Sequence, residues 1–203
     1  MGICYIVAAG EMHGRIPALS ADDLLIAADA GYLHLKQLNI EPHILLGDFD
    51  SMQLPDGTDA IVHPVVKDDT DTMLAIKLGF EKGYKDFVVY GALGGERTDH
   101  TVANLQSLAY IAENSGRGTL VGKGESFTLI RNSEITLESD KDKTFSVFAY
   151  GGNADGVTIK GSMYDVENVM LTPFFPLGVS NKFKEEKVTV SVINGYLLII
   201  YSK

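Results

Sequence analysis

The chain has 203 residues, of which 45% are hydrophobic and 22% charged, and its 17 basic and 27 acidic side chains give a net charge of −10. These values are typical of a globular protein of one or two domains and exclude extended disorder. The acidic balance disfavours binding to nucleic acid or to an anionic membrane, because both need a basic face. No apolar run reaches the roughly 18 residues that a membrane-spanning helix requires.

The first residues of the chain and its cysteine content indicate the cellular compartment in which the protein is expected. Residues 1–5 lack the basic residues and the cleavage site of a signal peptide. The single cysteine, Cys4, excludes an internal disulfide and a cage of several cysteines around a metal. We therefore expect a cytoplasmic protein in which Cys4 is part of the packing.

Apolar runs alternate with helical patterns in the first part of the chain. Five runs are typical of strands buried on both faces: 3–9, 24–28, 43–46, 87–90 and 119–121. Three stretches between them place apolar residues at helical spacing: 31–38, 73–80 and 102–111. The alternation predicts an α/β fold with a mostly parallel sheet flanked by helices.

The chain changes character near residue 133 and shows no helical pattern after it. Strand-like segments follow at 145–150, 156–160, 166–171 and 187–193. Asn194-Gly195 lies between two apolar strands and predicts a tight hairpin, since a type I′ turn needs positive φ at both positions. We therefore expect an α/β domain over residues 1–132 and an all-β antiparallel domain over 133–203.

Four polar motifs follow the predicted strands of the first domain. In open α/β sheets, ligands bind beyond the carboxyl ends of the strands, so these motifs are the candidates for function. They are Ala-Asp-Ala-Gly at 28–31, Gly-Asp-Phe-Asp-Ser at 47–51, Lys-Asp-Asp-Thr-Asp at 67–71, and the glycine-rich stretch 91–100.

Asp48 and Asp50 are two residues apart, which directs both carboxylates to one side of an extended chain. Two adjacent carboxylates repel each other unless a cation lies between them or one is protonated. Oxygen ligands of this kind suit Mg²⁺, which binds one or two carboxylates together with substrate phosphates. The alternative is a polar turn with a capping residue.

Three acids, Asp68, Asp69 and Asp71, surround Thr70 at the start of a predicted helix. One such residue is explained as a cap that satisfies free N–H groups and the positive end of the helix dipole. Three acids in four residues are better explained by a metal or a cationic substrate. Both interpretations stay open at this point.

The glycine-rich stretch contains Gly91, Gly94 and Gly95 and is followed by Arg97. Its backbone N–H groups could hold a phosphate at the start of a helix, or the glycines could form a tight structural turn. Arg97 could brace a phosphate, or it could form a surface ion pair. The segment 118–124 is not a Walker A loop, because it is one residue short and lacks the Ser or Thr after Lys.

Four histidines, at positions 13, 34, 43 and 63, show no metal-ligand spacing such as His-x-x-x-His. We expect these side chains to be structural or exposed. They add no metal site to the acidic motifs.

Taken in order, 28–31, 47–51, 67–71 and 94–100 resemble the thiamine pyrophosphokinase family. The segments 104–106 (Asn-Leu-Gln) and 178–181 (Gly-Val-Ser-Asn) are similar to that family too. The resemblance covers most of the chain. Two positions depart from the usual pattern: Ala30 stands where the family has glycine, and Glu96 separates the glycines from Arg97.

The resemblance implies transfer of a pyrophosphoryl group from ATP to the hydroxyl of thiamine, giving thiamine diphosphate and AMP. It also implies a β-sandwich second domain that binds thiamine, and a homodimer with active sites shared between subunits. Asp48, Asp50 and Asp71 would be the catalytic residues that hold Mg²⁺ and phosphates. The ATP site would contain Asp29, Ser51, Thr70, Arg97 and Asp99. Substrate contacts would come from Asp69, Ser180 and Asn181, the last two in the thiamine pocket.

Two rival functions remain. A metal-dependent nucleotide pyrophosphate hydrolase fits the acidic motifs, but it leaves Ser180, Asn181 and the β domain without an obvious role. A non-catalytic nucleotide-binding regulator is disfavoured, because every acidic position of the motifs is kept.

Overall fold

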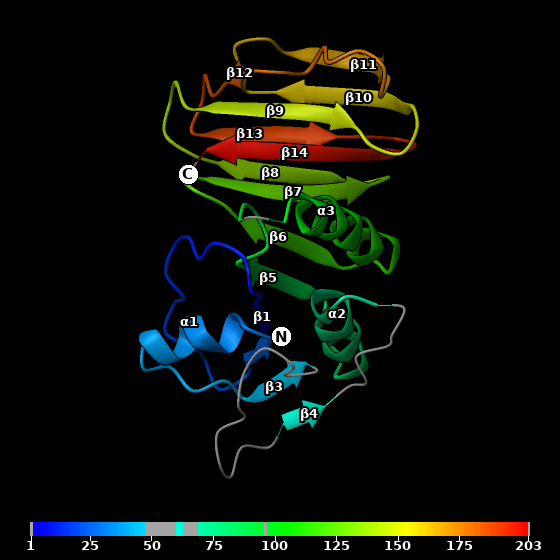
Figure 1. Cartoon of the computed structure of the whole chain (residues 1–203). Coiled ribbons are helices and arrows are strands. Elements are labelled where there is room, and N and C mark those ends of the chain that lie inside the picture. Colours follow the sequence, from blue (N-terminus) through cyan, green and yellow to red (C-terminus); the bar gives the residue numbers. More distant parts are fainter. Residues whose placement is uncertain (1, 48–59, 63–68, 96, 203) are drawn as a thin grey trace. The chain divides into compact units, whose positions relative to one another are not determined.

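The computed structural model describes residues 2–47, 60–62, 69–95 and 97–202 (Figure 1). The chain forms two compact units, Met1–Lys123 and Gly124–Lys203. The boundary expected from the sequence, after residue 132, lies just beyond β7 (Glu125–Arg131), the first strand of the second unit. None of the helices among the described residues is long and apolar enough to cross a membrane.

The first unit is a parallel sheet with helices, as the alternating pattern predicts (Figure 1). Its strands are β1 (Ile3–Val7), β2 (Leu24–Ala28), β3 (Ile44–Gly47), β4 (Ala60–Val62), β5 (Asp86–Tyr90) and β6 (Arg117–Val121). Its helices are α1 (Gly31–Gln37), α2 (Asp71–Glu81) and α3 (Thr98–Glu113). The strand order is β6-β5-β1-β2-β3-β4, and all the pairings between these strands are parallel.

The central strands of this sheet are buried on both faces, which explains their continuous apolar runs. From β1, Tyr5 and Val7 pack in one core cluster with Tyr32 and Leu35 of α1. Cys4, which precedes Tyr5, points to the other face, where a Cβ added to Gly79 of α2 would lie 3.0 Å from its Sγ. Burial raises the pKa of the Cys4 thiol to about 12, so this cysteine is a packing residue, as expected.

The strand order places a topological switch point between β1 and β5. From β1 the chain adds β2, β3 and β4 on one side, and then returns to add β5 and β6 on the other. Connections on the two sides of such a point diverge, which leaves a crevice beyond the carboxyl ends of the two strands. A ligand site is therefore expected among the residues that follow β1 and β5.

The second unit is a sandwich of two antiparallel sheets. One has the order β12-β9-β14-β7 and the other β11-β10-β13-β8. Besides β7, its strands are β8 (Glu134–Glu138), β9 (Thr144–Ala149), β10 (Ala154–Lys160), β11 (Val166–Leu171), β12 (Asn181–Lys182), β13 (Lys187–Ser191) and β14 (Tyr196–Ser202). Alternate side chains fill the space between the sheets, including Phe145 and Phe183, whose rings meet edge to face at 5.2 Å.

The predicted hairpin at Asn194-Gly195 is wrong. β13 pairs with β8 and β10, whereas β14 pairs with β7 and β9 in the other sheet. Of the two turn residues, only Gly195 has a positive φ, at 113°. Both strands bury one apolar face in the same core, so placing them in opposite sheets satisfies their patterns as well as pairing would.

Candidate active site

A cavity of about 530 Å³ lies at the carboxyl ends of β1, β2 and β5, within the first unit. Segments that follow these strands line it, together with the starts of α2 and α3. Its lining includes Gly10, Glu11, Asp29, His34, Thr70, Asp71, Gly91, Gly94, Gly95, Arg97 and Asn104. The switch point of the sheet is thus the site of the cavity.

Asp29 enters the cavity at the end of β2. Its backbone is left-handed, with φ of 50°, and its N–H donates to the Leu46 carbonyl at 2.7 Å. Its own carbonyl accepts the N–H of Tyr32 in the first turn of α1 at 3.2 Å. These bonds fix a conformation that is unusual for a residue other than glycine, and residues so held cluster at functional sites.

The glycine that the first motif requires is Gly31. A Cβ at this position would lie 1.9 Å from the Val7 carbonyl oxygen, so no other residue lets α1 begin so close to β1. Ala30 has a right-handed backbone with φ of −60°, a conformation that any residue adopts. The alanine that departs from the family pattern is therefore compatible with the turn.

Asp71 is the first residue of α2 and faces the cavity. Thr70 caps this helix, because its hydroxyl accepts the N–H of Met73 at 3.2 Å. The cap is thus supplied by Thr70, and the Asp71 carboxylate is not needed for it. Asp71 and Asp29 bring two carboxylates from different elements to one cavity.

Asp69 is engaged by a lysine of the helix that follows it. Lys77 Nζ lies 2.6 Å from Asp69 Oδ2, and this hydrogen bond raises the pKa of the lysine. Both side chains are partly exposed, so the pair adds little stability. It anchors the segment before Asp71 to the body of α2.

The glycine turn after β5 packs tightly on the segment after β1. Gly91, Gly94 and Gly95 all have positive φ, and Gly10 N–H donates to the Gly91 carbonyl at 2.8 Å. Asn104 of α3 is buried and donates to the Ala92 carbonyl at 2.7 Å. The turn is therefore held from both sides, with part of its backbone on the cavity wall.

Arg97 lines the cavity at the residue before α3. Its guanidinium donates to Asp99 Oδ2 at 3.0 Å, and this bond is the main reason that the pKa of Asp99 is lowered. Arg97 is 69% exposed, so it can leave this ion pair at small cost. Asp99 is not part of the cavity lining.

Asp48, Asp50 and Ser51 lie outside the described residues. The chain approaches them at Gly47, where an added Cβ would lie 3.1 Å from the Cα of Asp29. Among the residues that the structure describes, no three histidine, cysteine or acidic side chains are grouped closely enough to hold a metal. The carboxylates of Asp29 and Asp71 are nevertheless the hard oxygen donors that Mg²⁺ takes, so the residues present fit this ion.

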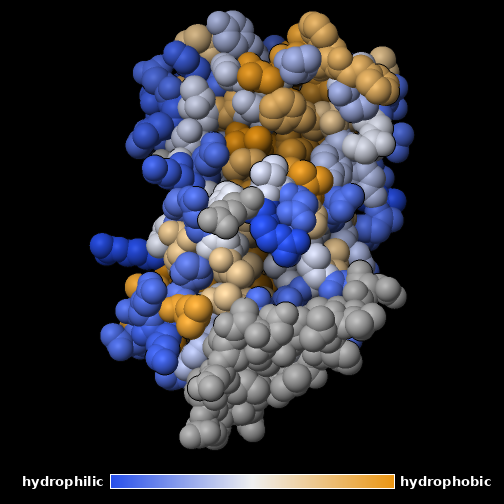
Figure 2. All heavy atoms as spheres, viewed as in Figure 1, coloured by the Kyte–Doolittle hydropathy of each residue, from blue (hydrophilic) through white to orange (hydrophobic). Residues whose placement is uncertain are grey.

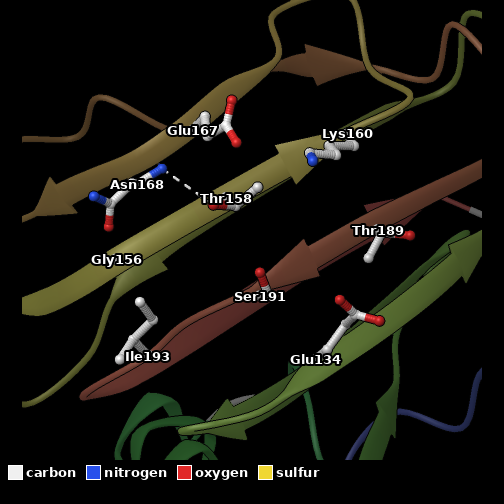
Figure 3. Close-up of a pocket in the computed structure, with 9 residues that line it drawn as sticks. All are labelled: Glu134, Gly156, Thr158, Lys160, Glu167, Asn168, Thr189, Ser191 and Ile193. Carbon is white, nitrogen blue, oxygen red and sulfur yellow. Dashed lines mark hydrogen bonds between the residues drawn. The ribbon is translucent and has the colours of Figure 1, made fainter.

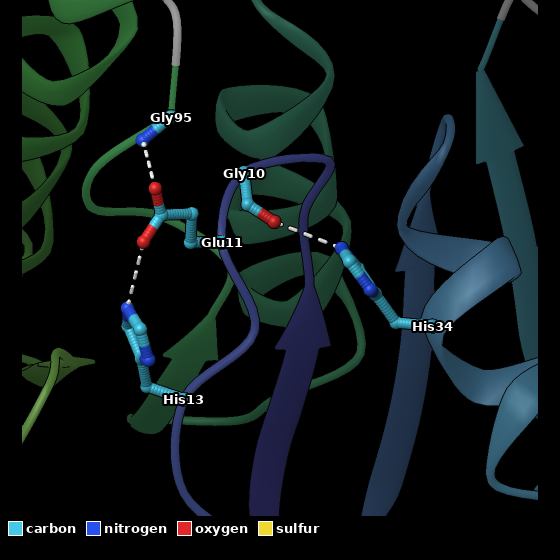
Figure 4. A network of polar contacts seen from close by, with 5 residues as sticks. All are labelled: Gly10, Glu11, His13, His34 and Gly95. Atoms are coloured by element: carbon cyan, nitrogen blue, oxygen red, sulfur yellow. Dashed lines mark hydrogen bonds and ion pairs between the residues drawn. The ribbon is translucent and has the colours of Figure 1, made fainter.

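Two cavity residues lie outside the predicted motifs: Glu11, which the sequence did not indicate, and His34, which was expected to be structural or exposed. Figure 4 shows both as parts of one polar network. His34 Nε2 donates to the Gly10 carbonyl at 2.8 Å. Glu11 accepts the Gly95 N–H at 3.3 Å and lies 3.3 Å from His13 Nε2 (Figure 4). Neither Glu11 nor His34 belongs to one of the four motifs. Their hydrogen bonds form because β1, β5 and α1 meet at the switch point. His43, in contrast, is structural as expected, since Leu25 N–H donates to its Nδ1 at 2.9 Å.

Ser180 and Asn181 belong to the second unit. Ser180 has a left-handed backbone, with φ of 59°. The buried Asn181 side chain accepts the Tyr164 N–H at 3.2 Å and donates to the Tyr164 carbonyl at 3.0 Å. Asn181 also donates to Ser162 Oγ at 3.2 Å. It therefore clamps the turn before β11 and leaves the Tyr164 side chain 65% exposed.

A second hollow, of about 490 Å³, lies on the outer face of the sheet β11-β10-β13-β8 (Figure 3). Hydroxyl and charged side chains line it, and Thr158 Oγ1 accepts the Asn168 N–H at 3.1 Å. Side chains of β13 alternate between the two faces of the sheet: Val188 and Val190 face the core, while Thr189 and Ser191 face outward. The polar lining of the hollow follows from this alternation. A solvated sheet face accounts for this hollow.

The first cavity therefore brings together a glycine turn, an arginine and two carboxylates at a switch point, where ligands bind in open α/β sheets. Comparison with known families gives two matches: "Thiamin pyrophosphokinase, catalytic domain" over residues 17–118, and "Thiamin pyrophosphokinase, vitamin B1 binding domain" over residues 132–197. The chain belongs to the thiamin pyrophosphokinase family.

Individual relatives agree. A thiamine pyrophosphokinase of Bacillus subtilis is 27% identical over 208 residues, covering 97% of each chain. A crystal structure of the Bacillus subtilis enzyme has a TM-score of 0.86 at 25% identity, covering 100% of this chain and 99% of that one. A Geobacillus thermodenitrificans structure, also a thiamin pyrophosphokinase, has a TM-score of 0.84 at 25% identity, with coverage of 99% and 97%. The resemblance seen in the motifs thus extends over both units.

Proposed function

We propose that this chain transfers a pyrophosphoryl group from ATP to the hydroxyl of thiamine, giving thiamine diphosphate and AMP. The observation that carries the proposal is the cavity at the switch point, where the glycine turn 91–95, Arg97, Asp29 and Asp71 meet in a member of this family. The hydroxyl oxygen of thiamine bonds to the β-phosphorus of ATP, and the bond from that phosphorus to the α,β-bridging oxygen breaks. AMP leaves, and the hydroxyl proton is released.

The residues of the cavity position the triphosphate. Pyrophosphoryl transfer needs alignment and charge stabilisation more than covalent catalysis. Backbone N–H groups of the glycine turn bind phosphate oxygens, and Arg97 moves from Asp99 to the phosphates. Asp29, Thr70 and Asp71 line the opposite part of the site, with Ser51 assigned to the ATP site as well.

Mg²⁺ is part of this proposal. Asp71, together with Asp48 and Asp50, would hold it, because carboxylates are its preferred protein ligands. The bound ion would neutralise charge on the phosphates and orient them. This role suits a chain with a net charge of −10, which would otherwise repel ATP.

The second unit supplies the thiamine pocket in our proposal, and Asp69 of the first unit is assigned as a further substrate contact. The Asn181 side chain makes hydrogen bonds to the backbone of Tyr164 and to Ser162, so it acts by positioning the turn. Ser180 lies beside this clamp. The group that the clamp presents is the exposed ring of Tyr164, and an aromatic face attracts the cationic thiazolium of thiamine.

We further propose a homodimer in which each active site joins the first unit of one subunit to the second unit of the other. Figure 2 shows apolar side chains gathered on the viewer's face of the second unit. The exposed apolar residues of this unit include Met163, Met170, Phe174, Phe175, Leu177 and Val179, and Phe174 is 91% exposed. Exposed apolar side chains gathered on one face in this way are typical of a protein interface.

Mixed dimers test the shared site. Asp71→Asn and the double variant Ser180→Ala with Asn181→Ala are each prepared, mixed equally, and unfolded and refolded together. Activity is measured at a thiamine concentration far below the wild-type KM, where the raised KM of the double variant makes it poorly active. Random pairing makes about half of the dimers mixed, and a shared site leaves one intact site in each of them, so activity recovers to about a quarter of wild type. Absence of recovery in well-folded mixed dimers contradicts the shared site and leaves the reaction untouched.

The reaction itself is tested by incubating the protein with ATP, Mg²⁺ and thiamine and measuring AMP. We expect AMP only when thiamine is present. Thiamine-independent AMP would identify a nucleotide pyrophosphate hydrolase, and no AMP would indicate a nucleotide-binding regulator. Because ATP is supplied in the cell interior, we assign the reaction to the cytoplasm.

A further inference from the structure

The Gly95 N–H, which faces the cavity, is engaged by a carboxylate of the protein itself. Glu11 Oε1 accepts this N–H at 3.3 Å (Figure 4). A Cβ at Gly94 would lie 3.4 Å from the Glu11 carboxyl carbon, so the carboxylate rests against both glycines. An anion therefore already lies against the turn that the proposed function assigns to a phosphate.

The backbone next to Glu11 is fixed. Gly10 N–H donates to the Gly91 carbonyl at 2.8 Å, and the Gly10 carbonyl accepts from His34 Nε2 at 2.8 Å. A Cβ at Gly10 would lie 2.5 Å from the Gly91 oxygen, which leaves no room for the two segments to slide. Any ligand that needs the Gly95 N–H must therefore move the Glu11 side chain and not the loop.

The Glu11 side chain can move. It is 60% exposed, and its second oxygen lies 3.3 Å from Nε2 of His13. A single exposed hydrogen bond to a carboxylate is weak enough to be exchanged for one to a phosphate oxygen. His13 gives the displaced carboxylate a second partner on the same segment.

Resting on the proposed function, we propose that Glu11 sets the affinity for the nucleotide: its carboxylate holds the Gly95 N–H and is displaced when a phosphate of ATP binds there. Until it is displaced, the carboxylate both occupies the donor and repels the incoming phosphates. Glu11 is thus a positioning residue that weakens ATP binding without taking part in the transfer.

Substitution of Glu11 separates this effect from a structural one. In Glu11→Ala, we expect a roughly three- to tenfold lower KM for ATP, with kcat and the KM for thiamine unchanged. Glu11→Gln keeps the size of the side chain and loses its charge, so its KM for ATP should lie between those of the wild type and Glu11→Ala. Glu41→Ala removes an exposed acid outside the cavity lining and is the matched control, with no change expected.

Measurements of ligand binding in the absence of thiamine test the role of Glu11 separately from the reaction. The dissociation constants of the α,β-methylene analogue of ATP and of inorganic pyrophosphate are measured with Mg²⁺ and without thiamine. Tighter binding of both by Glu11→Ala supports displacement, as does a shift of the Gly95 amide resonance when pyrophosphate binds the wild type. Equal or weaker binding by Glu11→Ala overturns it and leaves the proposed function standing. If neither the wild type nor Glu11→Ala binds these ligands, both the displacement of Glu11 and the proposed function are contradicted.

Discussion

The two units position functional groups in different ways. In the first unit, backbone geometry does so: strand ends, the left-handed Asp29 and the glycine turn 91–95 bring polar groups to one cavity. In the second unit, one buried side chain, Asn181, holds a turn 17 residues away and exposes Tyr164. The proposed phosphate site therefore depends on the sheet as a whole, whereas the exposure of Tyr164 depends on a few hydrogen bonds.

The largest effect should come from a carboxylate of the first unit. Asp71→Asn should lower kcat by about a hundredfold or more, because a lost ligand charge misplaces the phosphates. The melting temperature should change little, since Thr70 still caps α2. Asp48→Asn and Asp50→Asn should behave alike, and Asp22→Asn, outside the cavity, serves as control. Steady-state rates near wild type in two of the three variants would exclude the metal site.

The second effect concerns the backbone on which the first unit depends. Gly31→Ala should lower the free energy of unfolding by about 3 kcal/mol or more, because its Cβ would lie 1.9 Å from the Val7 carbonyl oxygen. The neighbouring change Ala30→Gly should cost about 1 kcal/mol or less, since its φ is ordinary. Urea unfolding monitored by circular dichroism compares the two. Equal costs would contradict the close approach of α1 to β1.

Arg97→Ala should raise the KM for ATP or lower kcat by about tenfold. A charge-assisted contact to phosphate contributes roughly 1.5–3 kcal/mol, and the pair with Asp99 has to be exchanged for it. Asp99→Asn, which frees the arginine, should leave both constants within about threefold of wild type. A change below twofold in Arg97→Ala would mean that the guanidinium stays with Asp99.

Substitutions in the second unit should change the KM for thiamine and no other kinetic constant. Tyr164→Ala should raise the KM for thiamine by about three- to tenfold, as expected for a lost cation–π contact, while Tyr164→Phe keeps it. Asn181→Ala should raise the same constant, because Tyr164 loses its clamp. The KM for ATP should not move in any of them. A loss in Tyr164→Phe equal to that in Tyr164→Ala would show that the hydroxyl, not the ring, is what matters.

The smallest effect concerns Asp165, which shares the turn with Tyr164. Burial would raise the pKa of Asp165, but hydrogen bonds from Ser162 outweigh it, and the pKa is lowered. A lowered pKa in the folded state means that the carboxylate stabilises the fold above the unfolded-state value of about 3.9, and that this contribution is lost as the pH falls through the folded value. The side chain is exposed, so the contribution is below about 1 kcal/mol. Melting temperatures of wild type and Asp165→Asn should differ slightly at pH 7 and converge at pH 2.

Sequence patterns predicted the first unit well. Its strands are buried on both faces and read as continuous apolar runs, so the segments 24–28 and 87–90 were located to within a residue. The carboxyl ends of parallel strands meet at one edge, so motifs 28–31 and 91–100 were expected to converge, and they do.

The sequence could not reveal contacts made by single polar side chains across the fold. Glu11 and Gly95 are 84 residues apart and meet only through the β1–β5 pairing. The hairpin prediction failed for a related reason, since a strand with one apolar face fits either sheet of a sandwich and local pattern does not choose between them. Asn181 was predicted as a contact to thiamine, and its clamping bonds follow from packing that no local motif encodes.

We propose that pyrophosphoryl transfer to thiamine takes place in the cavity of the first unit. The most direct test uses ATP labelled at the γ-phosphorus, with Mg²⁺ and thiamine, and separates the products for wild type and Asp71→Asn. We predict that wild type moves the label into thiamine diphosphate with release of an equal amount of unlabelled AMP, and that Asp71→Asn does so about a hundredfold more slowly. Label appearing in free pyrophosphate, or in thiamine monophosphate together with ADP, would contradict the account.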